Sequence, residues 1–198
     1  DNVSATTWQP FIYKLDTVAP TNPSTVVANP PGYTATNSYT FSWSGAADTG
    51  SGLAEYCYKT GEDGSTDTCI GTASIAGLTA YQTGSNTFYV RAKDAAGNLS
   101  STYVNASYYY SSVAPGAPQN LEVYPASNTL NSFAFTWEPP ELYYGSQAGL
   151  RYYYSVNALP TNTNVNAVGL ESPYLAAGAY ATQKDTNTMY VVAKDEAG

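Results

Sequence analysis

Few side chains in this sequence are equipped for catalysis. None of the 198 residues is histidine, so the commonest general base and the commonest metal ligand are both absent. Paired carboxylates are the remaining candidates, at Glu138 and Glu141 in EPPEL and at Asp63 and Asp67 in a Gly-rich stretch. Nothing in the sequence distinguishes an acid from a base within either pair. We therefore expect no catalytic residue, no cofactor and no enzymatic activity.

Carboxylates can also bind calcium. Asp48 in AADTGSG, together with Glu55 or Asp94, would supply the oxygen ligands that Ca²⁺ prefers. The matching loop of the second half of the chain, PPELYYGSQAG, does not repeat this set. An Asp in a Gly-rich turn usually accepts hydrogen bonds from its own backbone. We therefore predict no metal site, and we assign Asp94 and Asp195, which stand at matching places, to hairpin turns.

The two cysteines, Cys57 and Cys69, flank a segment rich in Gly, Ser, Thr and Asp. This composition predicts a turn between two strands. A disulfide across the turn would stabilise the fold by roughly 2–3 kcal/mol through loop closure, and it would indicate an extracellular or cell-surface location. The alternative is a pair of free thiols.

Charge and hydropathy exclude two classes of partner. The chain carries 15 acidic and 7 basic residues, a net charge of −8, so nucleic acid is not an expected partner. No apolar run approaches the roughly 20 residues that span a bilayer, so we expect no membrane insertion in this segment.

The most informative pattern is an internal repeat of about 95 residues. NTFYVRAKDAAG (86–97) and NTMYVVAKDEAG (187–198) are identical at nine of twelve positions. TVAPTNP (17–23) matches SVAPGAP (112–118), and SYTFSWSG (38–45) matches SFAFTWEP (132–139). Aromatic and apolar residues alternate with period two in these segments, which predicts strands. The chain is therefore expected to be all-β, with about seven strands in each copy, and the Pro-rich linker to be semi-rigid.

These residues resemble fibronectin type III-like or Ig-like tandem repeats of bacterial surface proteins. Alternating aromatics before Trp137-Glu138-Pro139-Pro140 are similar to strand B of that family, and V-x-A-K-D-x-A-G-N-x-S (90–100) is similar to strand F and the start of strand G. The resemblance implies two tandem Ig-like/fibronectin III-like β-sandwiches. The family often places a corner tyrosine where Asn86 and Asn187 stand, so we expect this corner to be built differently here.

The ends of the chain are out of phase with its repeat. Residues 17–111 contain a whole sandwich, whereas residues 112–198 contain strands A to F without a strand G. Residues 1–16 are similar to residues 97–112, a strand-G segment, and form an orphan strand. We expect this strand to complete a neighbouring sandwich through Trp8, Phe11, Tyr13 and Leu15. The expected acceptor core is Phe133, Phe135, Trp137, Met189, Val191 and Ala193.

Three arrangements satisfy this pattern. The repeats are continuous in one long polypeptide, or separate copies exchange strands head to tail, or residues 1–16 fold back onto their own second sandwich. The first two predict a linear extracellular rod or filament, since heterologous pairing does not close. The rival function is an adhesin or a carbohydrate- or protein-binding module, because clustered tyrosines such as 108–110 and 152–154 suit a glycan or a host-surface ligand. Ordinary packing within strands also explains these tyrosines.

Overall fold

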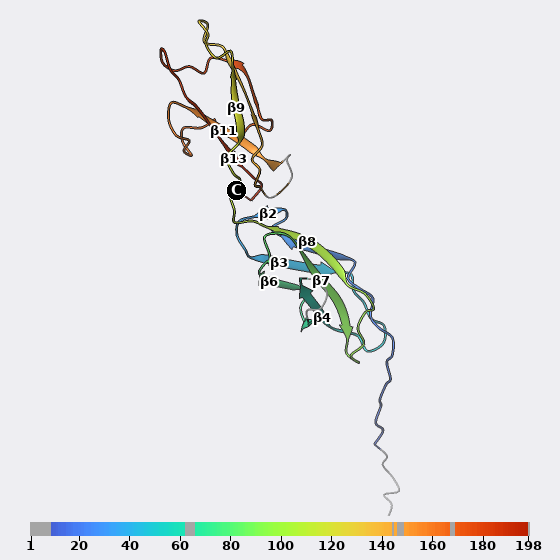
Figure 1. The fold of residues 1–198 in the computed structure, drawn as a ribbon. Coiled ribbons are helices and arrows are strands. Elements are labelled where there is room, and N and C mark those ends of the chain that lie inside the picture. Colours follow the sequence, from blue (N-terminus) through green and yellow to red (C-terminus); the bar gives the residue numbers. More distant parts are fainter. Residues whose placement is uncertain (1–8, 62–65, 144, 146–148, 167–168, 198) are drawn as a thin grey trace, which may run out of the picture.

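The computed structural model describes residues 9–61, 66–143, 145, 149–166 and 169–197, and it is all-β over this part of the chain. Figure 1 shows two β-sandwiches arranged end to end, with the amino-terminal residues leaving the first sandwich at the end opposite the second. Among the described residues, no helix is long and apolar enough to cross a membrane.

The first sandwich has the strand order of a fibronectin type III domain. One sheet has the order β1-β3-β6, and its strands are β1 (Thr25–Asn29), β3 (Tyr39–Ser44) and β6 (Ser74–Leu78). The facing sheet has the order β2-β8-β7-β4-β5, and its strands are β2 (Tyr33–Thr34), β4 (Leu53–Thr60), β5 (Thr68–Ile70), β7 (Gly84–Asp94) and β8 (Val104–Tyr110). All pairings are antiparallel except the short parallel pair β2–β8.

The second sandwich repeats five of these strands within its described residues. One sheet has the order β12-β10-β9, with β9 (Gln119–Tyr124), β10 (Phe133–Glu138) and β12 (Tyr174–Gly178). The other contains β11 (Arg151–Val156) and β13 (Met189–Lys194). The counterparts in the first sandwich are β1, β3, β6, β4 and β7. No described strand of the second sandwich takes the place of β8.

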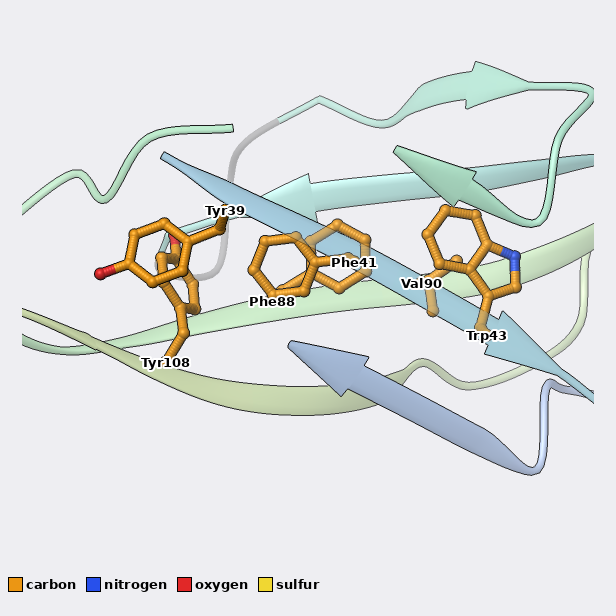
Figure 2. Close-up of a cluster of buried hydrophobic side chains, with 6 residues drawn as sticks. All are labelled: Tyr39, Phe41, Trp43, Phe88, Val90 and Tyr108. Carbon is orange, nitrogen blue, oxygen red and sulfur yellow. The ribbon is translucent and has the colours of Figure 1, made fainter. Parts of the chain in front are cut away.

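The core of the first sandwich follows the period-two pattern of the sequence. Along β7 every second residue is buried, and β3 buries Tyr39, Phe41 and its tryptophan. Phe41 stacks on Phe88 with ring centroids 4.1 Å apart. Tyr108 of β8 lies edge-on to Tyr39 at 4.7 Å and to Phe41 at 5.1 Å, so β8 closes the core between the two sheets (Figure 2).

An asparagine builds the corner before strand F in both copies. Asn86 is fully buried, and its Oδ1 accepts hydrogen bonds from the N–H groups of Tyr81 (3.1 Å) and Gln82 (3.2 Å). Its Nδ2 donates to the carbonyls of Gln82 and Gly84, both at 2.9 Å. Asn187 repeats three of these four contacts on its own preceding loop: its Oδ1 accepts from the N–H groups of Thr182 and Gln183, and its Nδ2 donates to the carbonyl of Gln183. The expectation that the corner is built without tyrosine is confirmed, with Asn satisfying both donors and acceptors.

The segment after β7 differs from the tight hairpin that the sequence suggested. A turn does follow Asp94, and Lys93 bridges to Leu99, but β8 begins only at Val104, which pairs with Val90. Four residues, 100–103, therefore stand opposite only two, 91 and 92, so β8 carries two extra residues at this point. They allow Tyr103 to lie across the outer face of the sheet, where it takes part in the cluster described next.

Candidate functional site

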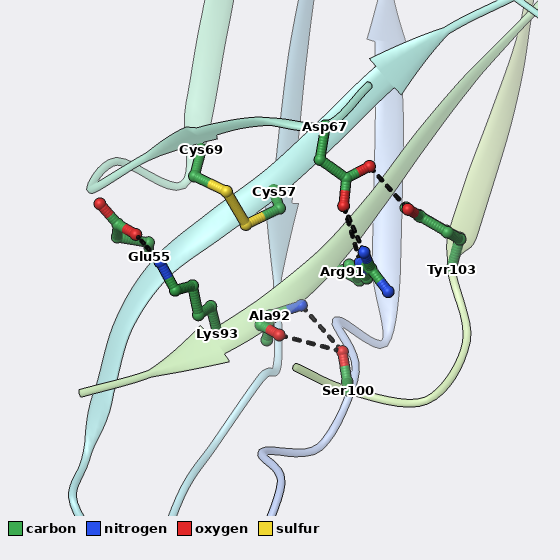
Figure 3. Close-up of a disulfide and its surroundings, with 9 residues drawn as sticks. All are labelled: Glu55, Cys57, Asp67, Cys69, Arg91, Ala92, Lys93, Ser100 and Tyr103. Carbon is green, nitrogen blue, oxygen red and sulfur yellow. Dashed lines mark hydrogen bonds and ion pairs between the residues drawn. A yellow bond between two sulfur atoms is a disulfide. The ribbon is translucent and has the colours of Figure 1, made fainter. Parts of the chain in front are cut away.

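The outer face of the first sandwich carries a disulfide beside a network of charged groups (Figure 3). Cys57 of β4 and Cys69 of β5 lie directly opposite each other and are bonded, so the predicted disulfide is present. The carboxylate of Asp67 accepts hydrogen bonds from Nε of Arg91 at 2.9 Å and from the hydroxyl of Tyr103 at 2.6 Å. Desolvation, and next the hydrogen bond to Asp67, raise the pKa of Tyr103.

Two cations flank the ring of Tyr103. Nζ of Lys59 lies 4.8 Å from the ring centroid, and the guanidinium carbon of Arg91 lies 4.6 Å from it. Tyr89 extends the aromatic surface, with its ring centroid 6.1 Å from that of Tyr103. The sequence places Val192 where the second sandwich aligns with Arg91, so this combination belongs to the first copy alone. We name residues 59, 67, 89, 91 and 103 the outer-face cluster.

Three carboxylates meet at the base of the first sandwich, the end from which the amino-terminal segment leaves. One oxygen from each of Asp16, Asp48 and Asp94 lies within 4.8 Å of the others. Such a set suits a hard cation such as Ca²⁺. The sequence analysis paired Asp48 with Asp94 or Glu55; Asp48 and Asp94 do come together, whereas Glu55 pairs with Lys93 at 2.9 Å.

Hydrogen bonds hold each of these carboxylates in place. Asp48 accepts from the N–H groups of Gly50 and Gly52, and Asp94 accepts from the N–H and side-chain amide of Asn98. Asp16 accepts at Oδ2 from the N–H of residue 51 at 2.6 Å. Hydrogen bonds from the side chain and backbone of residue 51, and from the N–H of residue 18, lower the pKa of Asp16. The predicted turn roles of Asp48 and Asp94 are therefore what the hydrogen bonds show.

The second sandwich contains an open groove of about 450 Å³. Side chains from both sheets line it: Leu121 and Val123 of β9, Phe133 and Phe135 of β10, and the stretch 185–189 at the start of β13. β13 pairs with β11 on one side, and no described strand pairs with its other edge. In the first sandwich β8 occupies the corresponding place, between β1 and β7.

Burial at equivalent positions differs between the two copies. Tyr39, Phe41 and Phe88 are at most 1 % exposed, whereas their counterparts Phe133, Phe135 and Met189 are only partly buried. On β9, Leu121 is 42 % exposed and Val123 is 41 % exposed, although their counterparts on β1 pack against the first core. The second sandwich is well closed only around Trp137, Leu150, Tyr152 and Leu175.

The structure places the predicted acceptor residues in two groups. Trp137 belongs to the buried cluster of the second sandwich, and Phe135, Met189, Val191 and Ala193 pack against this cluster as partly buried side chains. Phe133 and Phe135 line the groove together with Met189. The sequence analysis missed Leu121 and Val123, although their alignment with Val26 and Ala28 on β1 could have identified them.

The predicted donor residues are exposed. Phe11, Tyr13 and Leu15 are 91 %, 93 % and 90 % exposed, and residues 9–16 form no strand in this single chain. Trp8 and Asp63 lie outside the described residues. The donor role of residues 9–16 stays a prediction, because it concerns contacts with a neighbouring sandwich.

No family model matches this chain. Chitinase A1 from Niallia circulans is 34 % identical over 192 residues, an alignment that covers 93 % of this chain and 25 % of that protein. The chain thus spans about a quarter of the length of the curated relative it matches.

Solved structures with a similar arrangement show lower identity. Chitinase ChiA74 from Bacillus thuringiensis is 20 % identical with a TM-score of 0.41, over 93 % of this chain and 28 % of that one. The FN1-FN3 domains of chicken CNTN1 are 17 % identical with a TM-score of 0.43, over 91 % and 62 %. The strand order itself defines the class of fold: two tandem β-sandwiches of the fibronectin III-like, Ig-like kind.

Proposed function

We propose that this chain is a structural repeat unit of a linear extracellular array, in which a strand of the neighbouring unit fills the groove of the second sandwich. The unequal burial of equivalent residues carries this proposal. The same aromatic pattern is closed by β8 in the first sandwich and is only partly covered by the described residues of the second. The neighbouring unit is either a separate copy placed head to tail or the next part of a continuous polypeptide.

An exposed strand edge beside an apolar groove favours the addition of a strand. The free edge of β13 offers backbone hydrogen-bonding groups, and the groove offers apolar surface. Phe11, Tyr13 and Leu15 alternate along a segment that is almost wholly exposed. Burying one such side chain contributes about 1.5–3 kcal/mol. Three of them therefore supply a driving force comparable to the stability of a small domain.

The joint between the sandwiches suits a spacer. The linker 112–118 contains two prolines, which fix φ and favour an extended path. The N–H of Gly116 donates to the carbonyl of Leu142 at 2.8 Å, so the linker is tied to the second sandwich. The ring of Tyr33, in the first sandwich, lies near Gly145 in the second. The bond that ties the linker to the second sandwich and the contact between the two sandwiches at Tyr33 both limit bending at the joint.

The disulfide supports the extracellular part of the proposal, because disulfides persist in oxidising compartments. The proposal assigns no catalysis to this chain. Its work is mechanical, and its principal partners are copies of the same unit.

The mass of the native material under denaturing conditions tests the proposal. Released subunits near 21.0 kDa, together with rods in the native sample, would support strand exchange between separate chains. A species many times heavier would support a continuous tandem polypeptide. A native sample that contains neither rods nor long chains would contradict a linear array.

A second candidate function is a binding module of a larger secreted protein. Two observations favour it: the relative named a chitinase, and an outer-face cluster that combines tyrosine rings with cations in one copy only. Binding to insoluble chitin can be measured by depletion of the chain from solution. Binding that is lost in Tyr89→Ala and Tyr103→Ala, but kept in Tyr174→Ala on the second sandwich, would support this function.

A further inference from the structure

We infer that residues 9–15 of a second copy occupy the groove antiparallel to β13, in the register that places Phe11 opposite Met189 and Tyr13 opposite Asn187. This inference rests on the proposed function and deepens it, because it names the partner segment and its alignment. It follows from the first sandwich, where the same interaction is made within one chain.

The register is copied from β8. In the first sandwich Ala106 pairs with Phe88, and Tyr108 pairs with Asn86. TVAPTNP and SVAPGAP are related by 95 positions, and residues 9–16 lead directly into the first of them. Counting back from these motifs matches Tyr13 with Tyr108 and Phe11 with the position of Ala106. This alignment differs by one residue from the match of residues 1–16 with 97–112 given in the sequence analysis, and it is the one that turns Phe11, Tyr13 and Leu15 toward the groove.

The side chains that this register brings together are complementary. Tyr108 lies edge-on to Tyr39 and Phe41, whose counterparts Phe133 and Phe135 line the groove. A tyrosine at position 13 can make the same two contacts.

The other inward positions fit as well. Met189 is smaller than Phe88, its counterpart, which leaves room for Phe11 where the first sandwich has the small Ala106. Leu15 comes opposite Asp185, which has φ 72°, and the counterpart of Asp185 is Gly84, with φ 93°. In both sandwiches, the residue at this end of the edge therefore has a left-handed backbone conformation.

Residues 9–15 cannot fill the groove of their own second sandwich, so this segment must act on a neighbouring unit. The carbonyl of Asp16 accepts a hydrogen bond from Asn98 at 3.2 Å, and its carboxylate accepts one from the N–H of Ser51. These bonds fix residue 16 at the base of the first sandwich. The amino-terminal segment leaves from this end, opposite the second sandwich (Figure 1). The 11 residues of β7 separate the two ends, a length of roughly 35 Å at about 3.3 Å per residue. Leu15 cannot cross that distance, because neighbouring Cα atoms are about 3.8 Å apart.

The resulting joint between copies reproduces the joint within the chain. In the chain, Tyr110 pairs with Gly84, and Ser111 then leads into the second sandwich. Between copies, residue 15 would pair with Asp185, and Asp16 would then lead into the next first sandwich. A head-to-tail array therefore repeats one kind of joint along its whole length.

Engineered cross-linking tests the register directly. Ile12 and Thr188 come opposite each other in this register. Ile12 lies between the inward-facing Phe11 and Tyr13, and Thr188 lies between their partners Met189 and Asn187. Since successive side chains of a strand point to opposite faces, both point away from the groove. The full chain with both Ile12→Cys and Thr188→Cys should form a ladder of covalent oligomers under mild oxidation. Ile12→Cys with Tyr190→Cys, two residues out of register, should not.

A single-residue comparison measures the contribution of the groove contact. Tyr13→Ser should weaken self-association, measured by sedimentation velocity, by about tenfold or more, whereas the outward-facing Lys14→Ser should change it by less than about twofold. Both residues are exposed in the single chain, so neither change threatens the fold.

The outcomes separate the inference from the proposed function. A ladder only with the 12/188 pair, and a loss with Tyr13→Ser, would support the inference. A ladder with the 12/190 pair instead would overturn the register while strand addition still stands. A chain that stays monomeric in every variant would overturn the inference, and the denatured mass of the native material would then decide the proposed function separately.

Discussion

Phe41 and Phe135 occupy equivalent positions, yet their truncation to alanine should have different costs. Phe41 is fully buried, stacked on Phe88 at 4.1 Å and edge-on to Tyr108. Phe41→Ala removes these contacts and leaves a closed cavity, which costs about 3–5 kcal/mol. Phe135 is only partly buried: it packs against the core cluster of the second sandwich and contacts Tyr180 with ring centroids 5.7 Å apart, but it also lines the open groove. Phe135→Ala enlarges a space already open to water, so we expect a cost of about 1–2 kcal/mol.

Guanidinium unfolding of the dilute chain measures both costs. Each sandwich should give its own unfolding transition, and the transition that a variant shifts is the one of the sandwich that carries the substitution. A synthetic peptide of residues 9–16 provides the second half of the experiment. Peptide should stabilise the second sandwich of the unmodified chain, and the cost of Phe135→Ala should then rise toward that of Phe41→Ala. Equal costs without peptide would refute the reasoning, because they would mean that the groove is already closed in solution.

Three further predictions concern the fold. Asn86→Ala leaves four backbone groups without their partner and should destabilise the first sandwich by about 2–4 kcal/mol, measured by chemical denaturation. Asn187→Ala should lower the free energy of unfolding by about half as much or less, because its loop is exposed. Desolvation raises the pKa of Tyr108 to about 12. Its contribution to stability is therefore complete below pH 10 and is lost as the pH rises toward 12, a loss that Tyr108→Phe should abolish in alkaline titration. Reducing the bond between Cys57 and Cys69 should lower the free energy of unfolding by about 2–3 kcal/mol without changing the far-UV spectrum of the folded chain.

Hydrophobic periodicity and repeated motifs were sufficient to predict the fold. Alternation in SYTFSWSG and SFAFTWEP placed Tyr39, Phe41 and Trp137 on inward faces, where the structure has them. The pattern could not show that Met189 and Phe133 are only partly buried. Period two identifies the face of a strand, whereas burial depends on whether a neighbouring strand covers that face.

Contacts between distant loops could not be predicted from the sequence. Asp16 was assigned to a strand, but its carboxylate lies beside those of Asp48 and Asp94 at the base of the first sandwich. Folding brings together three distant parts of the chain there: the segment before β1, the loop with Asp48 and the turn with Asp94. Gly50 takes part in this arrangement, because any side chain at that position would collide with the carboxylate of Asp16.

The parallel pairing of β2 with β8 has a mechanical consequence. The chain enters the first sandwich at its base and leaves through Ser111 at the opposite end. In the proposed linear array, tension would therefore pull β8 one way and β2, through β1, the other. Tyr33 pairs with Tyr109, Thr34 pairs with Tyr110, and the N–H of Ser111 donates to the carbonyl of Thr34. These bonds lie across the direction of pull and are loaded together in shear, not opened one at a time. Such a clamp slows forced unfolding, which depends on the unfolding rate and not on equilibrium stability.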